Sequence, residues 1–239
     1  MPSPDAESAG LEAAVVAVDG PSGSGKSSTA RGVAIALGLR YLDTGAMYRA
    51  ITWAVLETGV DPADPVAVAE LASRLRLQSG TDPQAPTIAV DGVDVSGAIR
   101  GRAVTGAVSA VSAVPAVREQ MVARQRELIG DGGIVVEGRD IGTAVAPDAT
   151  LKVFLTAHVH ARAQRRTAQA GGPVSAHQTT REDLDRRDRL DSSRQVSPLA
   201  RAEDAVDVDT TDLTLREVVE RIVRLVGRRV QPRDGQVWR

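Results

Sequence analysis

The sequence predicts an α/β fold in which helices cover both faces of a parallel β-sheet. Short apolar runs alternate with helix-like segments along most of the chain, which is the order of elements that a parallel sheet requires. The first apolar run is followed at once by a glycine-rich loop and then by a helix-like segment. The chain has 239 residues, which suits one domain with an insertion and allows a substantial core.

Five apolar runs have the length and composition of strands buried on both faces. The first is the valine-rich AAVVAV, and another is LKVFL. The five expected strands cover residues 13–18, 41–42, 133–136, 151–155 and 205–208.

Two helices have clear ends in the sequence. The helix after the glycine-rich loop is expected to stop near Gly38. The last helix begins at a capping box, because Glu217 follows Thr214 by three residues, and Gly227 is expected to end it. Its apolar stripe consists of Leu215, Val218, Val219, Ile222, Leu225 and Val226.

Two stretches interrupt the alternation of strands and helices. Residues 71–112 carry glycines, prolines and the segment TIAVDGVDVSG, in which Asp91 and Gly92 form a strong hairpin-turn signal. We interpret this stretch as an inserted subdomain. Residues 157–194 are rich in charged side chains, and the pair Gly171–Gly172 supplies a bend, so we interpret them as a mobile lid.

The two ends of the chain are polar. Residues 1–12 and 228–239 are expected to be tails without fixed structure, which leaves a single domain at 13–227.

Composition excludes several classes of protein. The chain has no cysteine, so it forms no disulfide, zinc–thiolate site or thiol nucleophile. A formal charge of -2 gives no overall attraction to nucleic acid or to an anionic membrane. The longest uncharged stretch, 103–117, is too short to span a bilayer and contains Pro115. We expect a cytoplasmic protein with neither nucleic acid nor membrane as a partner, and a monomer because no exposed apolar stripe is visible.

Residues 20–27, GPSGSGKS, match the P-loop pattern at every position, after an expected strand and before an expected helix. In such a loop, backbone N–H groups converge on phosphate oxygens and the helix N-terminus adds partial positive charge. Lys26 is placed to reach the β and γ phosphates, and the hydroxyl of Ser27 is placed to ligate Mg²⁺. The expected ATP-binding residues are Gly20, Pro21, Ser22, Gly23, Ser24, Gly25, Lys26, Ser27 and Ser28.

A P-loop leaves two classes open: a kinase that passes a phosphoryl group to a small acceptor, or a switch or motor driven by hydrolysis. The chain contains no asparagine, so the NKxD element of GTPase switches is absent. Its length leaves little room for a motor, and a kinase is favoured. Of the 29 basic side chains only Lys26 and Lys152 are lysines, so a lysine stands where a compact ammonium suits the phosphate cradle.

Arginines mark an expected acceptor site. Arg49 and Arg139 follow expected strands, and ligands of open α/β sheets bind at the carboxyl ends of strands. The guanidinium fork suits phosphate oxygens, and Asp140 neighbours Arg139. A phosphate monoester is already largely dianionic at neutral pH, so it needs positioning and charge neutralisation but no general base. The three histidines are therefore given no catalytic role.

Several segments together resemble bacterial cytidylate kinases in order and spacing, from about Val15 to Val226. They are GPSGSGKS, YLDTGAMYRA, DVSGAIR, VPAVREQMVARQR, VVEGRDIGT, PDATLKVFLTA and RRDRLDSSRQVSPL. The resemblance implies a P-loop NTPase-type parallel sheet flanked by helices, with a monophosphate-binding insert at about 71–112 and a short lid at about 157–194. It also implies transfer of the γ-phosphoryl group of ATP, with Mg²⁺, to CMP or dCMP, giving CDP or dCDP.

The resemblance also implies roles for single residues. Thr44, Arg49 and Arg139 would hold the acceptor phosphate, and Arg187 with Asp191 would reach the ribose. The residues implied around the cytosine are Ser109, Arg118, Asp140 and Arg194. The residues implied to act on the transferring phosphoryl group are Lys26, Arg139, Arg165 and Arg166.

Two positions depart from the pattern that the resemblance suggests. Thr44 stands where a serine is expected and keeps the hydroxyl, and Glu137 stands where the family can carry aspartate.

The expected base site favours cytosine over uracil. A carboxylate accepts a hydrogen bond from the N4 amino group of cytosine, whereas uracil reverses the donor and acceptor pattern of the base, so UMP should be disfavoured. The alternatives are another P-loop kinase acting on UMP, AMP or shikimate, or a non-catalytic nucleotide-dependent regulator.

Overall fold

The computed structural model describes residues 10–169 and 177–230. Its core is a five-stranded, fully parallel sheet with the strand order β2-β6-β1-β7-β8. The strands are β1 (Val15–Asp19), β2 (Arg40–Asp43), β6 (Ile134–Glu137), β7 (Leu151–Thr156) and β8 (Val206–Asp209). The five runs predicted from the sequence are these five strands, with bounds that differ by at most two residues.

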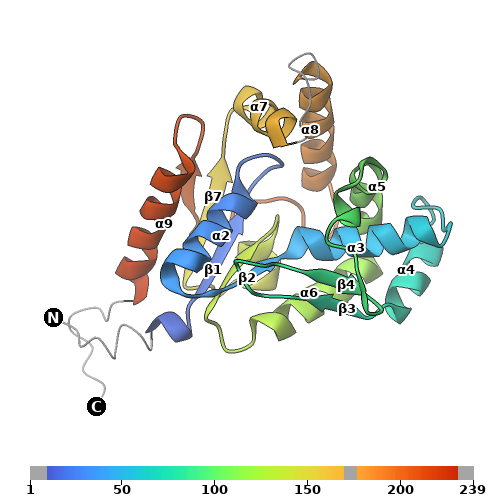
Figure 1. The fold of residues 1–239 in the computed structure, drawn as a ribbon, viewed down its shortest axis with the longest axis horizontal. Helices are drawn as coiled ribbons and strands as arrows, with labels where there is room; N and C mark the ends of the chain where they lie inside the picture. Colours follow the sequence, from blue (N-terminus) through green and yellow to red (C-terminus); the bar gives the residue numbers. More distant parts are fainter. Residues whose placement is uncertain (1–9, 170–176, 231–239) are drawn as a thin grey trace.

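Helices cover both faces of this sheet (Figure 1). On one face, α2 (Lys26–Leu37) and α9 (Leu215–Val230) pack against the side chains of Val16, Val18 and Leu155. On the other face lie α3 (Thr44–Glu57), α5 (Arg102–Ala113) and α6 (Pro115–Ile129). The predicted α/β class is confirmed, because helices pack against both faces of a parallel sheet.

A second, smaller sheet lies beside α3. It is antiparallel and consists of β3 (Leu77–Ser79), β4 (Ile88–Val90) and β5 (Val93–Asp94). The expected hairpin turn is present: Asp91 has φ 50° and Gly92 has φ 85°, the left-handed conformation that a tight turn of this kind requires. The helix α4 (Pro65–Arg74) precedes this sheet, and the short 3₁₀-helix η1 (Ala98–Arg100) follows it.

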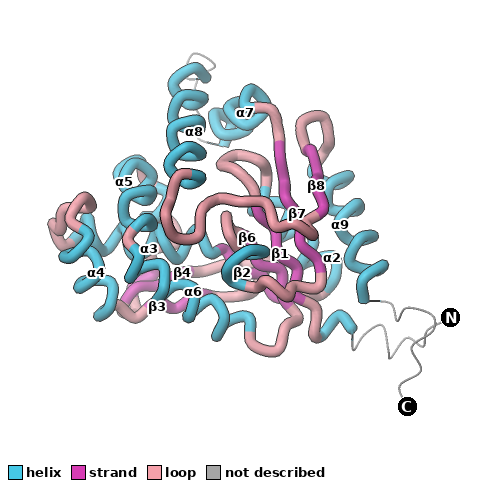
Figure 2. The backbone as a smooth tube through the Cα atoms, turned by 180° about the vertical axis from the view of Figure 1, so that it is seen from behind, coloured by secondary structure: helices cyan, strands magenta, loops and turns pink. Residues whose placement is uncertain are grey.

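Two helices rise above the carboxyl edge of the main sheet, as Figure 2 shows from behind. They are α7 (Val159–Gln169) and α8 (His177–Ser192), and both belong to the segment 157–194 that was interpreted as a lid. The expected bend at 171–172 lies outside the described residues.

The last helix differs from the prediction. The capping box is present, since the N–H and Oγ1 of Thr214 donate to Glu217 Oε2 at 2.8 and 2.7 Å. However, α9 runs through Gly227 to Val230, because Val230 packs against the core and continues its apolar face. The expected end at Gly227 is therefore wrong, and Leu215, placed in the apolar stripe, is exposed.

Parts of the two expected tails belong to the fold. Residues 10–12 are helical, and Leu11 packs against the core beside α9, while 228–230 belong to that helix. The other residues of the two expected tails, 1–9 and 231–239, lie outside the described residues. Within the described ranges, no helix combines the length and apolarity needed to cross a membrane.

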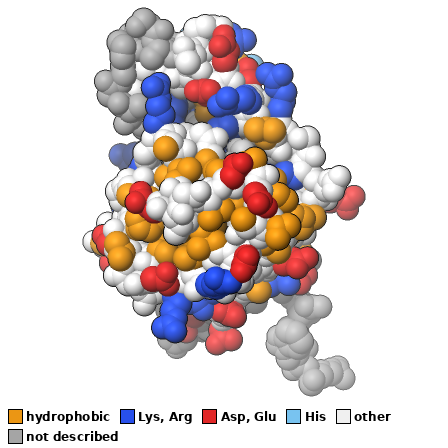
Figure 3. Space-filling view, turned by 90° about the vertical axis from the view of Figure 1, so that its right-hand side faces the viewer, with side chains coloured by type: hydrophobic (Ala, Val, Ile, Leu, Met, Phe, Trp, Pro, Cys, Tyr) orange, Lys and Arg blue, Asp and Glu red, His pale blue; other side chains and the backbone are white. Residues whose placement is uncertain are grey.

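One face of the molecule carries a broad area of hydrophobic side chains interrupted by single acidic ones (Figure 3). Val66 on α4 and Val93 on β5 are among the exposed large hydrophobic side chains. The expectation of a monomer was based on the lack of an apolar stripe in the sequence, and this face weakens that reasoning.

Candidate active site

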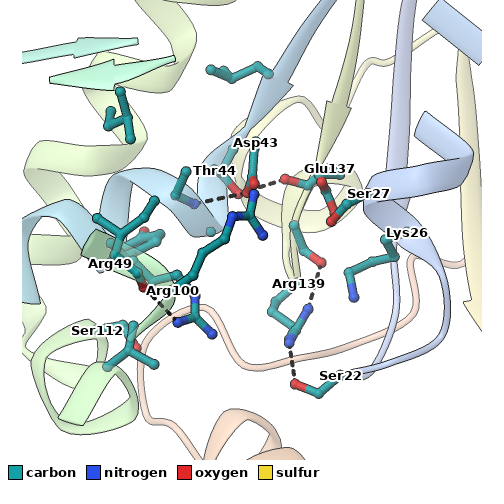
Figure 4. Close-up of a pocket in the computed structure, with 18 of the residues that line it drawn as sticks. Ser22, Lys26, Ser27, Asp43, Thr44, Arg49, Arg100, Ser112, Glu137 and Arg139 are labelled. Atoms are coloured by element: carbon teal, nitrogen blue, oxygen red, sulfur yellow. Dashed lines mark hydrogen bonds between the residues drawn. The ribbon is translucent and has the colours of Figure 1, made fainter. Parts of the chain in front are cut away.

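A cavity of about 760 Å³ lies above the carboxyl edge of the main sheet. The P-loop and the ends of β2 and β6 form its floor, and α3, α5, α7 and α8 contribute to its walls. Figure 4 shows Lys26, Ser27 and Glu137 on one side of this cavity and Arg49, Arg100 and Ser112 on the other. Because all strands are parallel, their carboxyl ends bring together loops that are far apart in the sequence.

The P-loop has the backbone that its glycines allow. Gly20, Gly23 and Gly25 have φ values of 147°, 78° and 92°, and a Cβ atom on Gly20 would lie 2.1 Å from the carbonyl oxygen of Leu155. Helix α2 begins at Lys26, so its N-terminus points at the loop. Of the nine expected ATP-binding residues, six line the cavity: Ser22, Gly23, Gly25, Lys26, Ser27 and Ser28. The other three, Gly20, Pro21 and Ser24, do not.

Lys26 is buried, and its Nζ donates to the carbonyl oxygen of Pro21 at 2.8 Å. Burial lowers the pKa of Lys26, and the nearby charge of Arg139 lowers it further. The phosphates of a nucleotide would oppose both effects, so the site is suited to an anion.

Beside Lys26 lies a group of polar residues at the ends of β2 and β6. Tyr41 donates a hydrogen bond to the carboxylate of Glu137, and Ser27 also bonds to this carboxylate. Burial raises the pKa of Glu137, and the charge of Asp43 raises it further. Thr44, an expected acceptor residue, donates from Oγ1 to the backbone oxygen of Glu137 at 2.7 Å.

Four arginines converge on the opposite side of the cavity and are called the arginine cluster: Arg49, Arg100, Arg166 and Arg187. Burial, followed by the charges of Arg187 and Arg166, lowers the pKa of Arg49 to about 9. Burial and the charge of Arg139 lower the pKa of Arg187 to about 10. These groups are still charged at neutral pH, and their mutual repulsion is relieved when an anion of high charge binds among them.

Arg49, Arg166 and Arg187 were expected in the site from the sequence, whereas Arg100 was not. Arg100 ends η1, and its motif DVSGAIR was noticed, yet no strand end or motif position singled it out. Arg49 itself is held by the carbonyl oxygen of Ile99 and by Thr105 Oγ1, at 3.1 and 3.0 Å.

The expected base-binding residues form one polar wall of the cavity. Arg118 is almost wholly buried and donates to Asp140 Oδ2 and to the backbone oxygen of Ser112, the latter at 3.2 Å. Its guanidinium lies 5.2 Å from the centre of the Tyr48 ring. Ser109 and Arg194 line the same cavity, and the Nε atoms of Arg118 and Arg194 are buried without a hydrogen-bond partner among the described residues. Unsatisfied donors of this kind suit a ligand rich in acceptors.

Asp191 connects this wall to the P-loop. It accepts from Arg139 Nε at 2.9 Å and from Arg194, while Arg139 Nη2 donates to Ser22 Oγ at 2.7 Å. The two arginines lower the pKa of Asp191 despite its burial. Arg139, Asp191 and Arg194 are thus paired with one another, although sequence reasoning assigned each of them to a ligand.

The two expected lid arginines are placed differently from one another. Arg165 donates to Oγ1 and the backbone oxygen of Thr210, at 2.9 and 2.5 Å. Arg166 belongs to the arginine cluster and has no side-chain hydrogen bond among the described residues. Both line the cavity, and Arg165 lies against the P-loop, since a Cβ atom on Gly25 would be 4.0 Å from its Nη1.

Two anion sites that face each other across one cavity, one of them a P-loop on a parallel sheet, define a kinase of the P-loop class. The sequence profile of the cytidylate kinase family matches residues 16–228. The chain belongs to the cytidylate kinase family, and the resemblance stated from its motifs is confirmed.

Individual relatives agree with this family. A cytidylate kinase of Streptomyces avermitilis is 58% identical over 90% of this chain and 94% of its own length. Another, of Nocardia farcinica, is 53% identical over 93% of this chain and 97% of its own length. Among solved structures, a gluconokinase from Sinorhizobium meliloti 1021 covers 91% of this chain and 93% of its own, with 19% identity and a TM-score of 0.46. Shikimate kinase from Acinetobacter baumannii covers 92% and 96%, with 17% identity and a TM-score of 0.45.

Proposed function

We propose that this chain transfers the γ-phosphoryl group of ATP to CMP or dCMP, giving ADP and CDP or dCDP. The observation that carries the proposal is the placement of Lys26 and the arginine cluster on opposite sides of one cavity, with the Arg118–Asp140 pair in its wall. The P-loop suits the triphosphate of the donor, and the arginine cluster suits the monophosphate of the acceptor. The Arg118–Asp140 pair suits a base that carries a hydrogen-bond donor beside hydrogen-bond acceptors.

The proposed chemistry is direct attack of an acceptor phosphate oxygen on the γ-phosphorus, with ADP as the leaving group. The chain contributes positioning and charge: Lys26 holds the donor phosphates, Arg49 and Arg100 hold the acceptor phosphate, and Arg166 neutralises charge that develops between them. Arg139 lies between the two sites through its contacts to Ser22 and Asp191. No side chain is required as a base, because the acceptor is already anionic at neutral pH.

In the base site, Asp140 would accept from the N4 amino group of cytosine, and Arg118 or Arg194 would donate to N3 or O2. Ser109 would lie at the edge of the base. Arg187 and Asp191 would meet the ribose, where Asp191 would share its carboxylate between the sugar and the two arginines that it now pairs. This arrangement supports acceptance of dCMP, since Asp191 already has partners when a 2′-hydroxyl is absent.

The residues present fit a magnesium ion held mainly by substrate. Ser27 offers one hydroxyl at the start of α2, and the carboxylates of Glu137 and Asp43 lie beside it. Mg²⁺ in kinases is held by few protein ligands together with phosphate oxygens and water, which matches this sparse set. When bound, the ion would supply positive charge that offsets the negative charge of the phosphates.

The proposed partners are these two nucleotides alone, with neither nucleic acid nor membrane, and the proposed location is the cytoplasm, where both nucleotides are available. The state proposed is a monomer. Its test is the mass of the purified protein in solution.

A coupled assay of ADP release tests the activity. The purified protein is supplied with ATP, Mg²⁺ and one acceptor at a time: CMP, dCMP, UMP, AMP or shikimate. We expect turnover with CMP and dCMP and at least about 100-fold lower kcat/KM with UMP, because UMP leaves buried donors and acceptors unpaired. Equal turnover of UMP contradicts the proposed base site, and no ADP release with any of these acceptors would indicate the regulator.

A further inference from the structure

Ser22 of the P-loop is held by three side chains that are far away in the sequence. Its N–H donates to Asp188 Oδ1 at 3.0 Å, and its carbonyl oxygen accepts from Arg162 Nη1 at 2.9 Å. Its hydroxyl accepts from Arg139 Nη2 at 2.7 Å. Ser22 is buried, so these contacts satisfy its polar groups in place of water.

Arg162 and Asp188 also pair with each other. Arg162, on α7, donates to the carboxylate of Asp188, on α8, and is itself buried. Arg162 further donates from Nε to the backbone oxygen of Ala157 at 3.2 Å, which anchors it at the start of the lid. A Cβ atom on Gly23 would lie 3.1 Å from the Cβ atom of Arg162, so the backbone of α7 sits directly against the phosphate loop.

The charges of this pair indicate a positional role. A lone carboxylate on a P-loop amide would repel the nucleotide phosphates that the loop receives. Arg162 neutralises Asp188, so the contact to Ser22 is made at little electrostatic cost to the donor site. Neither side chain belongs to the arginine cluster or to the base-binding wall.

Helix α8 carries both Asp188, which contacts Ser22, and the nearby residues Arg187 and Asp191, which are expected to contact the acceptor. Asp188 and Asp191 are three residues apart, which places them on one face of the helix. Asp191 pairs with Arg139 and Arg194, and Arg187 extends into the cavity. An acceptor that engages Arg187, Asp191 and Arg194 therefore moves or fixes the same helix whose Asp188 holds Ser22.

We propose that Asp188 and Arg162 are positioning residues that couple the two substrate sites, by transmitting occupancy of the acceptor site through α8 to the shape of the phosphate loop at Ser22. This inference rests on the proposed function, because it needs CMP to occupy the acceptor site. Coupling of this kind is reciprocal: CMP tightens binding of the donor by the same factor by which the donor tightens binding of CMP.

The test is the binding of a non-hydrolysable ATP analogue, measured by calorimetry with and without saturating CMP. In the unmodified protein we expect CMP to lower the Kd of the analogue about tenfold, within the usual range of coupling between sites. Asp188→Asn keeps an oxygen for the Ser22 N–H but removes the charge that pairs with Arg162, and Arg162→Met removes the partner. Each is expected to reduce the coupling factor to about two or less, while the Kd of CMP alone changes less than about threefold.

The matched control is Asp183→Asn, on the same helix. Asp183 forms an exposed ion pair with Arg186 at 2.9 Å. It removes the same charge from α8 and is expected to keep the full coupling factor. Thermal unfolding of all variants confirms that they are folded, and the coupling factor is a readout that a general loss of stability does not move.

The possible failures are distinguishable. Full coupling in Asp188→Asn, or loss of coupling in Asp183→Asn, overturns the positioning role. CMP that binds the unmodified protein without changing the Kd of the analogue also overturns it. CMP that does not bind the unmodified protein at all overturns the proposed function instead.

Discussion

Tyr41 donates a hydrogen bond to the carboxylate of Glu137 across neighbouring strands, and both side chains are buried. Burial raises the pKa of Glu137, with a further contribution from Asp43, whereas Lys26 and the Tyr41 hydrogen bond lower it. Burial also raises the pKa of Tyr41 far above its ordinary value, so its hydroxyl remains a donor at every working pH. Tyr41 therefore helps to keep Glu137 ionised beside Lys26 and Ser27.

Tyr41→Phe removes this donor and should raise the pKa of Glu137. If activity requires the ionised carboxylate, the acidic limb of the pH profile of kcat/KM should move to higher pH by about one to two units, since a hydrogen bond to a charged group is worth about 1.5 to 3 kcal/mol. The measurement is kcat/KM for CMP between pH 5.5 and 8.5. Glu137→Gln is the companion variant, because it cannot titrate and should lose that limb altogether. An unchanged profile in Tyr41→Phe would show that the hydroxyl does not tune Glu137.

Lys26→Arg tests whether charge alone is sufficient at the phosphate loop. Lys26 is buried and reaches its position as a compact ammonium, whereas a planar guanidinium needs more space and offers its donors in a fixed plane. We expect kcat to fall about 100-fold or more, as for the loss of one preorganised donor at a reacting centre.

The control is Lys152→Arg, at the chain's other lysine. Lys152 pairs with the exposed Asp204 at 2.9 Å, away from the cavity lining. Its kcat should stay within about twofold of the unmodified value, since neither Lys152 nor Asp204 lines the cavity. If Lys26→Arg retains activity, positive charge alone is sufficient at this position and a lysine is not required.

The parts of the site that were predictable from the sequence are those carried by short, contiguous patterns. The P-loop is such a pattern, and Arg49 and Arg139 were found because they follow strands whose carboxyl ends meet. The contacts of Ser22 with Arg162 and Asp188 span 140 and 166 residues. No spacing in the sequence encodes contacts that distant.

The same distinction holds for the fold. The strands were predictable because each is a run of apolar residues, and the Asp91–Gly92 turn has a local conformational cause. Gly227 was expected to end the last helix because glycine is a poor helix former, with a cost of about 1 kcal/mol. The packing of Val230 against the core outweighs this local preference, and tertiary contacts of that kind are not visible in a helix considered alone.

Arg165 and Arg166 should differ in their effect on catalysis, although sequence reasoning treated them alike. Arg165 is tied to Thr210, on the loop after β8, whereas Arg166 lies among the cluster of like charges. We expect Arg166→Ala to lower kcat by about 100-fold, through lost neutralisation of the transferring group, and Arg165→Ala to lower it by less than about tenfold. Steady-state kinetics with CMP and ATP measures both. Equal losses of kcat would place both side chains on the phosphoryl group during the reaction.

The stability of the ligand-free protein should depend on pH through Asp19. Its carboxylate accepts from the backbone N–H groups of Ile141 and Gly142 at 2.9 and 2.8 Å, at the start of the single-turn π-helix η2 (Ile141–Val145). Burial nevertheless raises the pKa of Asp19 to about 6, above the ordinary value of 3.8. The folded state therefore binds more protons than the unfolded state between these two values.

The free energy of unfolding should accordingly fall as pH rises through this window, by an amount on the order of 3 kcal/mol, and level off above pH 6. Urea unfolding from pH 4 to 7 measures it. Asp19→Asn cannot titrate and should flatten this part of the curve. Asp94→Asn removes an exposed carboxyl group whose pKa is lowered by a hydrogen bond from Ser96, so it should leave the decline in place. A curve of the same slope in Asp19→Asn would mean that another buried carboxyl group, such as Glu137, accounts for the decline.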